Sequence, residues 1–376
     1  MNNIAISEAR LVYDLSMMRN IFADCPSRDN IKNDYSEFVS LNNMCAKLFY
    51  CKYDLNNLFK DPKGAQRIID KHQLAVFNQF VRFADKNQEL LLKTFLSYKK
   101  MLDDIDYQSI PFYKCCKGYS EKDFKDIIFS YFNSYGEKYY KIVKKYFDEQ
   151  RIQMKMKLSD KELQENFAGF FASFVTLSSG YILSRYSCLN SCSLASLAHE
   201  LGHAIDAETF IFPQQKTLPT LSDMLLEIPS TMFEVGLIDY LIKNEIDVDG
   251  GLVLYNDKSM FIDDTYDTLA KVYSLGDVDM DFYGTTFIDG EQYDFREDML
   301  YGLGYYFAFC FDVLKEQMEN KEFLKHFNDV MTMRKESTLE EIIELSGVSY
   351  DDFVNSTLIR PKLEDRYVRT RKRFNV

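Results

Sequence analysis

The chain has 376 residues, of which 46% are hydrophobic and 27% charged, the balance of a folded globular protein. Its formal net charge of −13 argues against a nucleic-acid partner, which needs a concentrated positive surface. The 8 cysteines form no CxxC pair and fit reduced thiols better than disulfides. The first residues resemble no secretory signal, and no apolar stretch reads as a good membrane span. We therefore expect a cytoplasmic protein that binds neither nucleic acid nor membrane, and whose oligomeric state the sequence leaves open.

The region before about residue 150 is predicted to be helical. The clearest helix has apolar residues at helical spacing between 124 and 131, preceded by Ser120 with Asp123 three positions on, as in a capping box. After Tyr135 and Gly136 the pattern restarts, which predicts two amphipathic helices joined by a short turn.

The pattern changes between residues 170 and 186. The segments 171–177 and 181–186 are rich in β-branched and aromatic residues, and Ser-Ser-Gly lies between them, which predicts a β-hairpin. Helices resume at about Ser193, and a looser, Asp- and Gly-rich region follows at about 244–290. We expect one mainly helical body with a small sheet.

Residues 199–203 read His-Glu-Leu-Gly-His, the HExxH arrangement. On a helix, His199 and His203 lie one turn apart and project side by side, so both imidazoles can bind one metal ion. Glu200 lies beside them and can act as the general base toward a water on that metal. The opposite stripe of the helix is apolar, which an exposed helix with two chance histidines does not explain: Leu194, Leu197, Ala198, Leu201 and Ile205. The motif predicts one zinc ion per chain.

A zinc hydrolase needs a third protein ligand and keeps the fourth position for water. Glu227 is the candidate, because it lies in an apolar helical segment where a carboxylate is costly to bury unless a cation or proton compensates it. Glu234, seven residues on and on the same face, could accept a hydrogen bond from a ligand histidine, and Asp223 is the alternative. Both acids could equally be solvated helix positions. The remaining histidines, His72 and His326, lie in ordinary helical contexts.

These motifs resemble the oligoendopeptidase F and thimet oligopeptidase family of zinc metallopeptidases. The most specific matches are SLAHELGHAID and EIPSTMFE, in the segment 193–234. Looser likeness covers roughly residues 110 to 360, including GYILSRY, LYGLGYYFAF and STLEEIIELSGVSYDDF. The chain would be a short member of that family.

The resemblance implies a mainly α, zincin-type (gluzincin) fold with a small β-sheet beside the active-site helix and a deep peptide-binding cleft. Residues 1–150 would form a helical wall of the cleft, and 151–376 the catalytic zinc-binding region. His199, His203 and Glu227 would bind zinc, and Glu200 would be the catalytic base.

By the same resemblance, the reaction would be hydrolysis of internal bonds in short peptides. An edge strand at about 180–186 would pair with the substrate backbone. The family holds the oxyanion with Tyr and His side chains near its Tyr-rich helix. Tyr301 and Tyr305 are the candidates here, and packed aromatic side chains are the equal alternative.

Two departures from the family pattern bear on function. Asp206 stands where the family usually has another histidine, and no histidine occurs between His203 and His326. Only 198 residues precede His199, fewer than family members generally carry, so we expect a more open cleft.

Three functional readings follow. The leading one is a zinc-dependent endopeptidase acting on oligopeptides. The second is a dedicated processing protease for one precursor or signalling peptide, which the short N-terminal half would suit. The third is a catalytically weak relative that binds peptides, favoured by the missing histidines and opposed by the intact HExxH glutamate.

Overall fold

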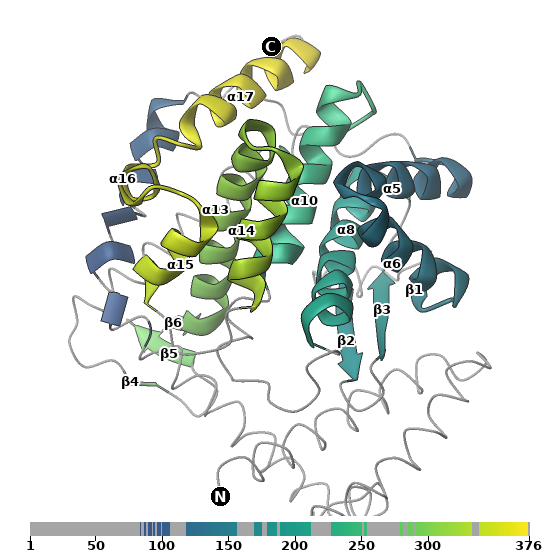
Figure 1. Cartoon of the computed structure of the whole chain (residues 1–376), viewed down its shortest axis with the longest axis horizontal. Helices are drawn as coiled ribbons and strands as arrows, with labels where there is room; N and C mark the ends of the chain where they lie inside the picture. The colour runs from purple at the N-terminus through teal and green to yellow at the C-terminus, as the bar shows by residue number, and fades with distance from the viewer. Residues whose placement is uncertain are drawn as a thin grey trace, which may run out of the picture.

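A computed structural model of the chain describes a mainly helical protein with two three-stranded sheets in its described part (Figure 1). The described residues are 118–155, 169–174, 179–185, 189–211, 227–249, 252–253, 279–280, 285–288, 291–332 and 338–374, with 100–105 and scattered positions between 83 and 98. The helices are α5 (Glu121–Tyr135), α6 (Glu137–Asp148), α8 (Ser191–Asp206), α10 (Glu227–Lys243), α13 (Phe295–Gln317), α14 (Asn320–Thr332), α15 (Leu339–Ser346), α16 (Tyr350–Asn355) and α17 (Arg360–Phe374). The strands are β1 (Ile152–Lys155), β2 (Gly169–Phe174), β3 (Ser179–Arg185), β4 (Asp279–Met280), β5 (Thr285–Ile288) and β6 (Glu291–Asp294).

The helix pair predicted around Gly136 is confirmed. Ser120 caps α5 by accepting a hydrogen bond from the backbone N–H of Asp123 at 3.1 Å. Gly136, with φ of 126°, separates α5 from α6 in a backbone conformation that favours glycine. The two helices pack on each other and on α8.

The predicted hairpin is present, but its place in the sheet differs from the prediction. Strands β2 and β3 pair antiparallel, with Phe171 opposite Ile182. The short strand β1 pairs with β3 in parallel on the other side, with Ile152 also opposite Ile182, so the order is β1-β3-β2. The expectation that residues 180–186 form an edge strand is therefore wrong. Among the described residues, β2 is the edge strand of the hairpin.

Helix α8 carries the HExxH motif and begins where the sequence predicts a helix to resume. Asn190 accepts a hydrogen bond from the Ser193 backbone N–H at 2.9 Å, and the Ser193 hydroxyl accepts one from the Asn190 backbone N–H at 2.7 Å, a complete capping box. The predicted apolar stripe is fully buried: Leu194, Leu197, Ala198, Leu201 and Ile205. The helix lies against β2 and β3 and continues as a π-helical turn, Ala207–Ile211.

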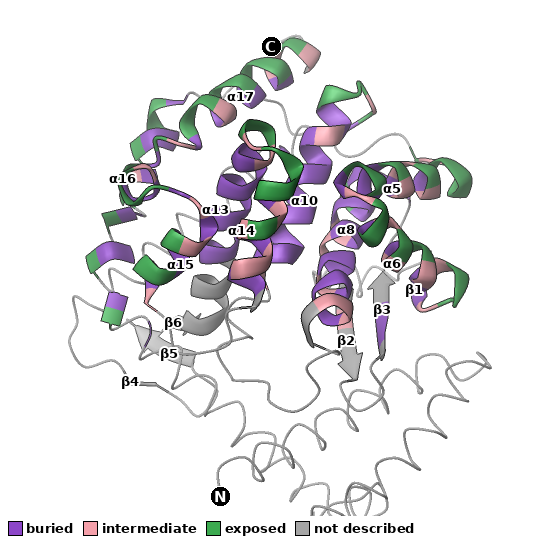
Figure 2. Ribbon diagram, viewed as in Figure 1, coloured by how far each residue is buried: buried purple, intermediate pink, exposed green. Residues whose placement is uncertain are grey.

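Helices α8, α10 and α13 form the centre of the described part. Helix α10 packs on α8 on one side and on α13 on the other. Figure 2 shows α10 and much of α8 and α13 as buried, whereas α5, α6 and α14 to α17 turn exposed residues outward. Helix α10 is therefore held on both sides, which fixes any side chain that it presents to α8.

The C-terminal helices cover α13 and reach α10. Thr338 and Glu341 form a capping box at the start of α15, and Gly347 ends that helix with φ of 79°. Helix α14 packs on α13 and α15, and α17 contacts α10. Among the described helices, none combines enough length and hydropathy to cross a membrane.

Several predictions concern residues outside the described part. These include residues 1–82, most of the looser region at 244–290, and the segment 212–226 between α8 and α10. The division at residue 150, the helical wall formed by residues 1–150 and the open cleft therefore stay predictions.

Candidate metal centre

The two HExxH histidines project from the same side of α8. Their rings lie 5.0 Å apart between centroids and meet edge to face at 80°. The side chains are mostly covered, with 12% of His199 and 15% of His203 exposed. The helical spacing of the motif thus places two imidazoles next to each other in a nearly buried position.

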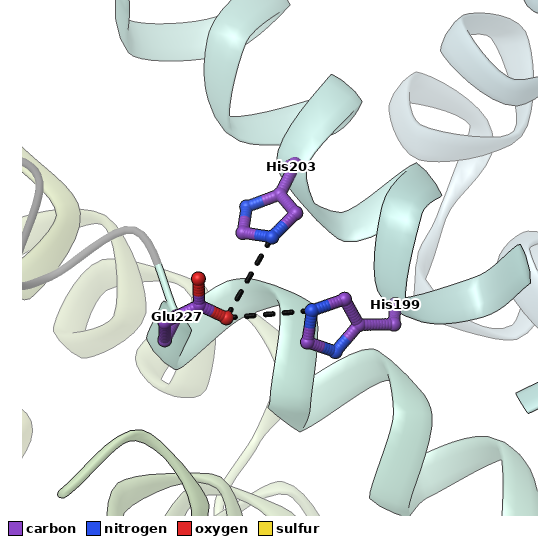
Figure 3. A group of neighbouring side chains, drawn as sticks. All are labelled: His199, His203 and Glu227. Carbon is purple, nitrogen blue, oxygen red and sulfur yellow. Dashed lines mark ion pairs between the residues drawn. The ribbon is translucent and has the colours of Figure 1, made fainter. Parts of the chain in front are cut away.

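Glu227, the first residue of α10, brings its carboxylate to both histidines (Figure 3). Its Oε2 lies 3.3 Å from His199 Nε2 and 3.6 Å from His203 Nε2, and the three ligand atoms lie within 4.8 Å of one another. Around a tetrahedral zinc ion with bonds of about 2.0–2.1 Å, neighbouring ligand atoms are about 3.3 Å apart. The arrangement therefore fits a single small cation bound between the three side chains.

The protonation of His199 indicates why a cation fits. Its Nε2 faces Glu227, and its Nδ1 lies 3.0 Å from Glu234 Oε2, so both ring nitrogens face acceptors. Burial lowers the pKa of His199, but the hydrogen bonds to Glu227 and Glu234 outweigh it and hold the pKa well above its ordinary value. A metal ion can replace the proton on Nε2 while Nδ1–H still donates to Glu234.

The Glu227 carboxylate is held by the two histidines and by the Ser230 hydroxyl. Burial raises its pKa, but the positive charge of His203 and the contacts with His199 outweigh burial and lower the pKa to about 2. The Ser230 hydroxyl contacts Glu227 Oε2 at 3.0 Å and the Glu227 carbonyl at 2.9 Å. The carboxylate is thus ionised and oriented, as a metal ligand must be.

Two glycines let the neighbouring helices approach Glu227 closely. A Cβ on Gly202 of α8 would lie 2.6 Å from Ser230 Cα and 2.8 Å from the Pro229 carbonyl oxygen. A Cβ on Gly304 of α13 would lie 3.0 Å from Glu227 Cβ. Helix α10 therefore begins in a space that only glycine leaves open on the α8 side, at the residue that contacts both histidines.

Glu200 lies between the two histidines in the sequence and is 5% exposed. Burial raises its pKa to about 8, and the nearby carboxylates Glu227 and Glu234 add to this, whereas His199 lowers it. A divalent cation at the site would lower this pKa, because positive charge favours the carboxylate. Together with Glu227 and Glu234, Glu200 gives the site three largely buried carboxyl groups, an excess that a cation would compensate.

Tyr305 contacts the same site from α13. Its hydroxyl donates a hydrogen bond to Glu234 Oε2 at 3.1 Å, and its side chain is buried. The sequence offered Glu234, with Asp223 as the alternative, as the acceptor for a ligand histidine, and it gave no connection between Tyr305 and Glu234. Tyr301 lies in α13 one turn earlier, and its side chain is outside the described part.

The other residues considered from the sequence lie elsewhere. His326, on α14, is partly buried and has its Nδ1 2.9 Å from the Leu345 carbonyl oxygen, so it packs between helices away from the metal ligands. Asp223 and His72 are outside the described residues. Asp206 is fully buried at the end of α8.

One contact at the site was not expected from the sequence. The ring of Phe171, on the edge strand β2, stacks on the His203 ring at 6.4 Å and 12°. The aromatic content of this segment gave no indication of which residue would face α8, because that depends on the packing of strand on helix.

Comparison with models of protein families gives no match, and none of the curated proteins is similar enough in sequence to match. Among solved structures, the chain is similar to a candidate peptidase from Chlamydophila abortus, with 16% identity and a TM-score of 0.46, covering 78% of this chain and 55% of that one. It is also similar to a candidate oligoendopeptidase F from Bacillus anthracis, with 12% identity and a TM-score of 0.45, covering 98% of this chain and 74% of that one. PZ peptidase A with an inhibitor gives 13% identity and a TM-score of 0.44, covering 98% and 75%. The chain thus spans about half the length of the first of these proteins and three quarters of the others. TM-scores this low decide neither fold nor function, so any function has to be inferred from the side chains of the site.

Proposed function

We propose that this protein is a zinc-dependent endopeptidase that hydrolyses oligopeptides. His199, His203 and Glu227 are the metal ligands and Glu200 is the general base. The observation that carries the proposal is the convergence of two imidazole Nε2 atoms and one carboxylate oxygen within 4.8 Å of one another. The residues around them, SLAHELGHAID and EIPSTMFE, resemble the oligoendopeptidase F and thimet oligopeptidase family in the same two segments.

The chain's own residues divide the chemistry between them. A bound zinc ion would polarise a water molecule and the scissile carbonyl. Glu200, ionised beside that charge, takes up a proton from the attacking water and passes it to the leaving amine. Glu234 holds His199 through Nδ1 at 3.0 Å, which keeps Nε2 directed toward Glu227.

The edge strand β2 supports an extended peptide as the substrate. It pairs with β3 on one side, lies against α8, and carries Phe171 against His203. Among the described residues, no strand pairs with the outer edge of β2. The backbone groups there can pair with a substrate backbone, which gives affinity without requiring one side-chain sequence. This favours oligopeptides, which can adopt an extended conformation, over folded proteins.

The experiment that tests this proposal is metal analysis paired with cleavage of a quenched peptide library, for wild type and Glu200→Gln. We expect the variant to keep its zinc and to lose turnover by about 10²–10⁴-fold, because the substitution removes the base and leaves the ligands intact. Glu208→Gln is the matched control, because Glu208 follows the same helix but pairs with Lys145 at 2.8 Å. The control should keep both zinc and turnover.

The same measurements separate the alternatives. Cleavage of many library peptides supports a general oligopeptidase, and cleavage of one sequence class supports a processing protease. Zinc binding with peptide binding but no turnover in wild type would leave a peptide-binding relative. If the wild-type protein held no stoichiometric zinc, the proposed metal site, and with it the proposed function, would be wrong.

A further inference from the structure

One oxygen of Glu234 receives two contacts. Its Oε2 lies 3.0 Å from His199 Nδ1 and accepts a hydrogen bond from the Tyr305 hydroxyl at 3.1 Å. Tyr305 is 3% exposed, and Glu234 is buried as well. The contacts therefore form a chain from α13, through a carboxylate of α10, to the histidine of α8.

A carboxylate with a single hydrogen bond can still rotate about its last torsion angle, which is broad in energy. A second donor on the same oxygen restricts that rotation, and a buried carboxylate gains more from each donor than a solvated one does. A fixed Glu234 carboxylate restricts the orientation of the His199 ring, because Nδ1–H has to point at that acceptor. The opposite nitrogen, Nε2, is then held toward Glu227.

The position of Tyr305 separates it from the reacting atoms. It binds the carboxylate on the Nδ1 side of His199, whereas the metal ligands converge on the Nε2 side. An oxyanion donor has to face the oxygen that the substrate develops, within about 2.7–3.1 Å. A buried hydroxyl that already donates to Glu234 on the far side of the histidine is poorly placed for that role.

The neighbouring residue of α13 strengthens this arrangement. Gly304 comes so close to Glu227 that a Cβ there would lie 3.0 Å from Glu227 Cβ. Two consecutive residues of α13 thus lie against the two glutamates of α10: Gly304 approaches the Cβ and backbone of Glu227, and Tyr305 donates to the Glu234 carboxylate. Helix α13 supports the metal site as a unit, through backbone contact at Gly304 and a hydrogen bond at Tyr305.

We propose that Tyr305 is a positioning residue for the metal site, which fixes Glu234 and through it the orientation of His199, and that it does not donate to the oxyanion. The inference rests on the proposed function, since it takes His199 as a metal ligand. It assigns the oxyanion to a donor other than Tyr305.

The test measures Zn²⁺ affinity by competition with a chromophoric chelator, the visible spectrum of the Co²⁺-loaded protein, and kcat at saturating Zn²⁺. For Tyr305→Phe we expect Zn²⁺ affinity about 10–100-fold weaker, an altered Co²⁺ spectrum, and kcat within a few fold of wild type. Tyr306→Phe is the matched control, because the Tyr306 hydroxyl is equally buried but contacts Ser356 at 2.9 Å and the Phe353 carbonyl. The control should leave all three measurements unchanged, even where its melting temperature falls.

A double substitution tests the route through Glu234. If Tyr305 acts through that carboxylate, Tyr305→Phe should weaken Zn²⁺ binding far less in a Glu234→Gln background than in wild type. If the two substitutions weakened Zn²⁺ binding by fully additive free energies, the inference would be overturned. Unchanged Zn²⁺ affinity and Co²⁺ spectrum in Tyr305→Phe would overturn it too, whether kcat falls, as for an oxyanion donor, or stays the same. A protein that binds Zn²⁺ with this Tyr305 dependence and cleaves no peptide would refute the proposed function and leave the inference standing.

Discussion

Helix α10 takes part in two buried clusters of charge, and they are built differently. At its N-terminal end, Glu227 and Glu234 face the imidazoles of His199 and His203. At its C-terminal end, Asp239 and Lys243 join a group contributed by α13 and α17, here called the lysine cluster: Asp239, Lys243, Asp312, Glu316 and Lys362. Both clusters hold carboxylates in a largely buried setting, but only the second contains lysine.

Lys362 is the centre of the lysine cluster. It is 10% exposed and lies 2.5 Å from Asp312, 3.3 Å from Glu316 and 3.6 Å from Asp239. Burial raises the pKa of Asp239, but the charge of Lys362 and the bond from Lys243 outweigh it, so that the pKa is lowered. Permanent cations of the chain itself thus compensate Asp239, whereas burial outweighs Lys362 at Asp312 and raises its pKa.

The metal site has no such cation among the described residues. Its carboxylates are compensated by imidazoles, which carry charge only when they hold a second proton. That proton can be exchanged for a metal ion, whereas a lysine ammonium cannot bind one. The identity of the basic partner, more than the burial of the acids, therefore separates a structural charge cluster from a candidate metal site.

Removing Lys362 should lower the stability of the fold most and leave the metal site intact. Lys362→Met leaves Asp239 and Asp312 buried without their central cation, which typically costs about 3–5 kcal/mol. We expect a marked loss of thermal stability with Zn²⁺ affinity within about threefold of wild type. Thermal unfolding and chelator competition measure the two quantities.

Arg360→Met on the same helix is the control for Lys362→Met. Its ion pairs with Asp104 and Glu364 are exposed and screened by solvent, so we expect little change in the melting temperature. A parallel collapse of Zn²⁺ affinity in the Lys362 variant would show that the two ends of α10 are coupled, and the distinction between a structural and a functional cluster would fail.

The two clusters also differ in how far they could be predicted. The metal site has local signals: HExxH gives two histidines by helical spacing, and Glu227 and Glu234 lie seven residues apart in an apolar helix. The lysine cluster joins Asp239, Asp312 and Lys362, which are far apart in the sequence, and no local pattern connects them.

Other differences from the sequence prediction have the same physical origin. β-branched and aromatic residues on either side of Ser-Ser-Gly predicted the β2–β3 hairpin. Strand order depends on the distant pairing of β1, so the edge strand that the family resemblance implied at residues 180–186 was wrong. The helix containing Tyr305 is rich in aromatic residues and buried nearly all round, so its periodicity could not indicate which tyrosine contacts α10. Local structure follows from local sequence, whereas the partners of a buried side chain follow from packing.

Gly202→Ala should disturb the metal site directly, by pushing the start of α10 away from α8. In Gly202→Ala the new methyl group would meet the backbone at Ser230 and Pro229, which cannot rotate away as a side chain can. We expect a loss of about 1–3 kcal/mol in stability. Because metal ligands tolerate distance changes of only about 0.2 Å, we also expect at least tenfold weaker Zn²⁺ binding.

The matched control for Gly202→Ala is Gly118→Ala, where a Cβ would lie 3.4 Å from the Leu189 carbonyl oxygen, an ordinary contact. That variant should resemble wild type in melting temperature and in Zn²⁺ affinity. Wild-type affinity in Gly202→Ala would mean that the start of α10 can shift without moving Glu227, and that the close approach does not set the site.

Of the two clusters, only the imidazole-based one should make Zn²⁺ affinity depend on pH. The pKa of His199 is held well above 6.5 in the metal-free protein, so its proton stabilises the fold fully below about pH 6.5, and this contribution is lost as pH rises through the folded pKa. Zinc must displace that proton from Nε2. Zn²⁺ affinity should therefore rise by about tenfold per pH unit below the folded pKa of His199 and level off above it, with about one proton released per ion bound.

Chelator competition between pH 6 and 8, with an indicator dye for proton release, measures this dependence. The pH dependence of stability has opposite signs in the metal-free and the zinc-bound protein. Without metal, the contribution of His199 to stability falls as pH rises. With Zn²⁺, the stabilisation by the ion grows over the same interval. His326→Gln, on α14 and away from the site, should leave the profile unchanged. A Zn²⁺ affinity that does not change with pH, together with no proton release, would show that zinc does not replace the His199 proton. The metal site and the lysine cluster would then differ only in where they lie on α10.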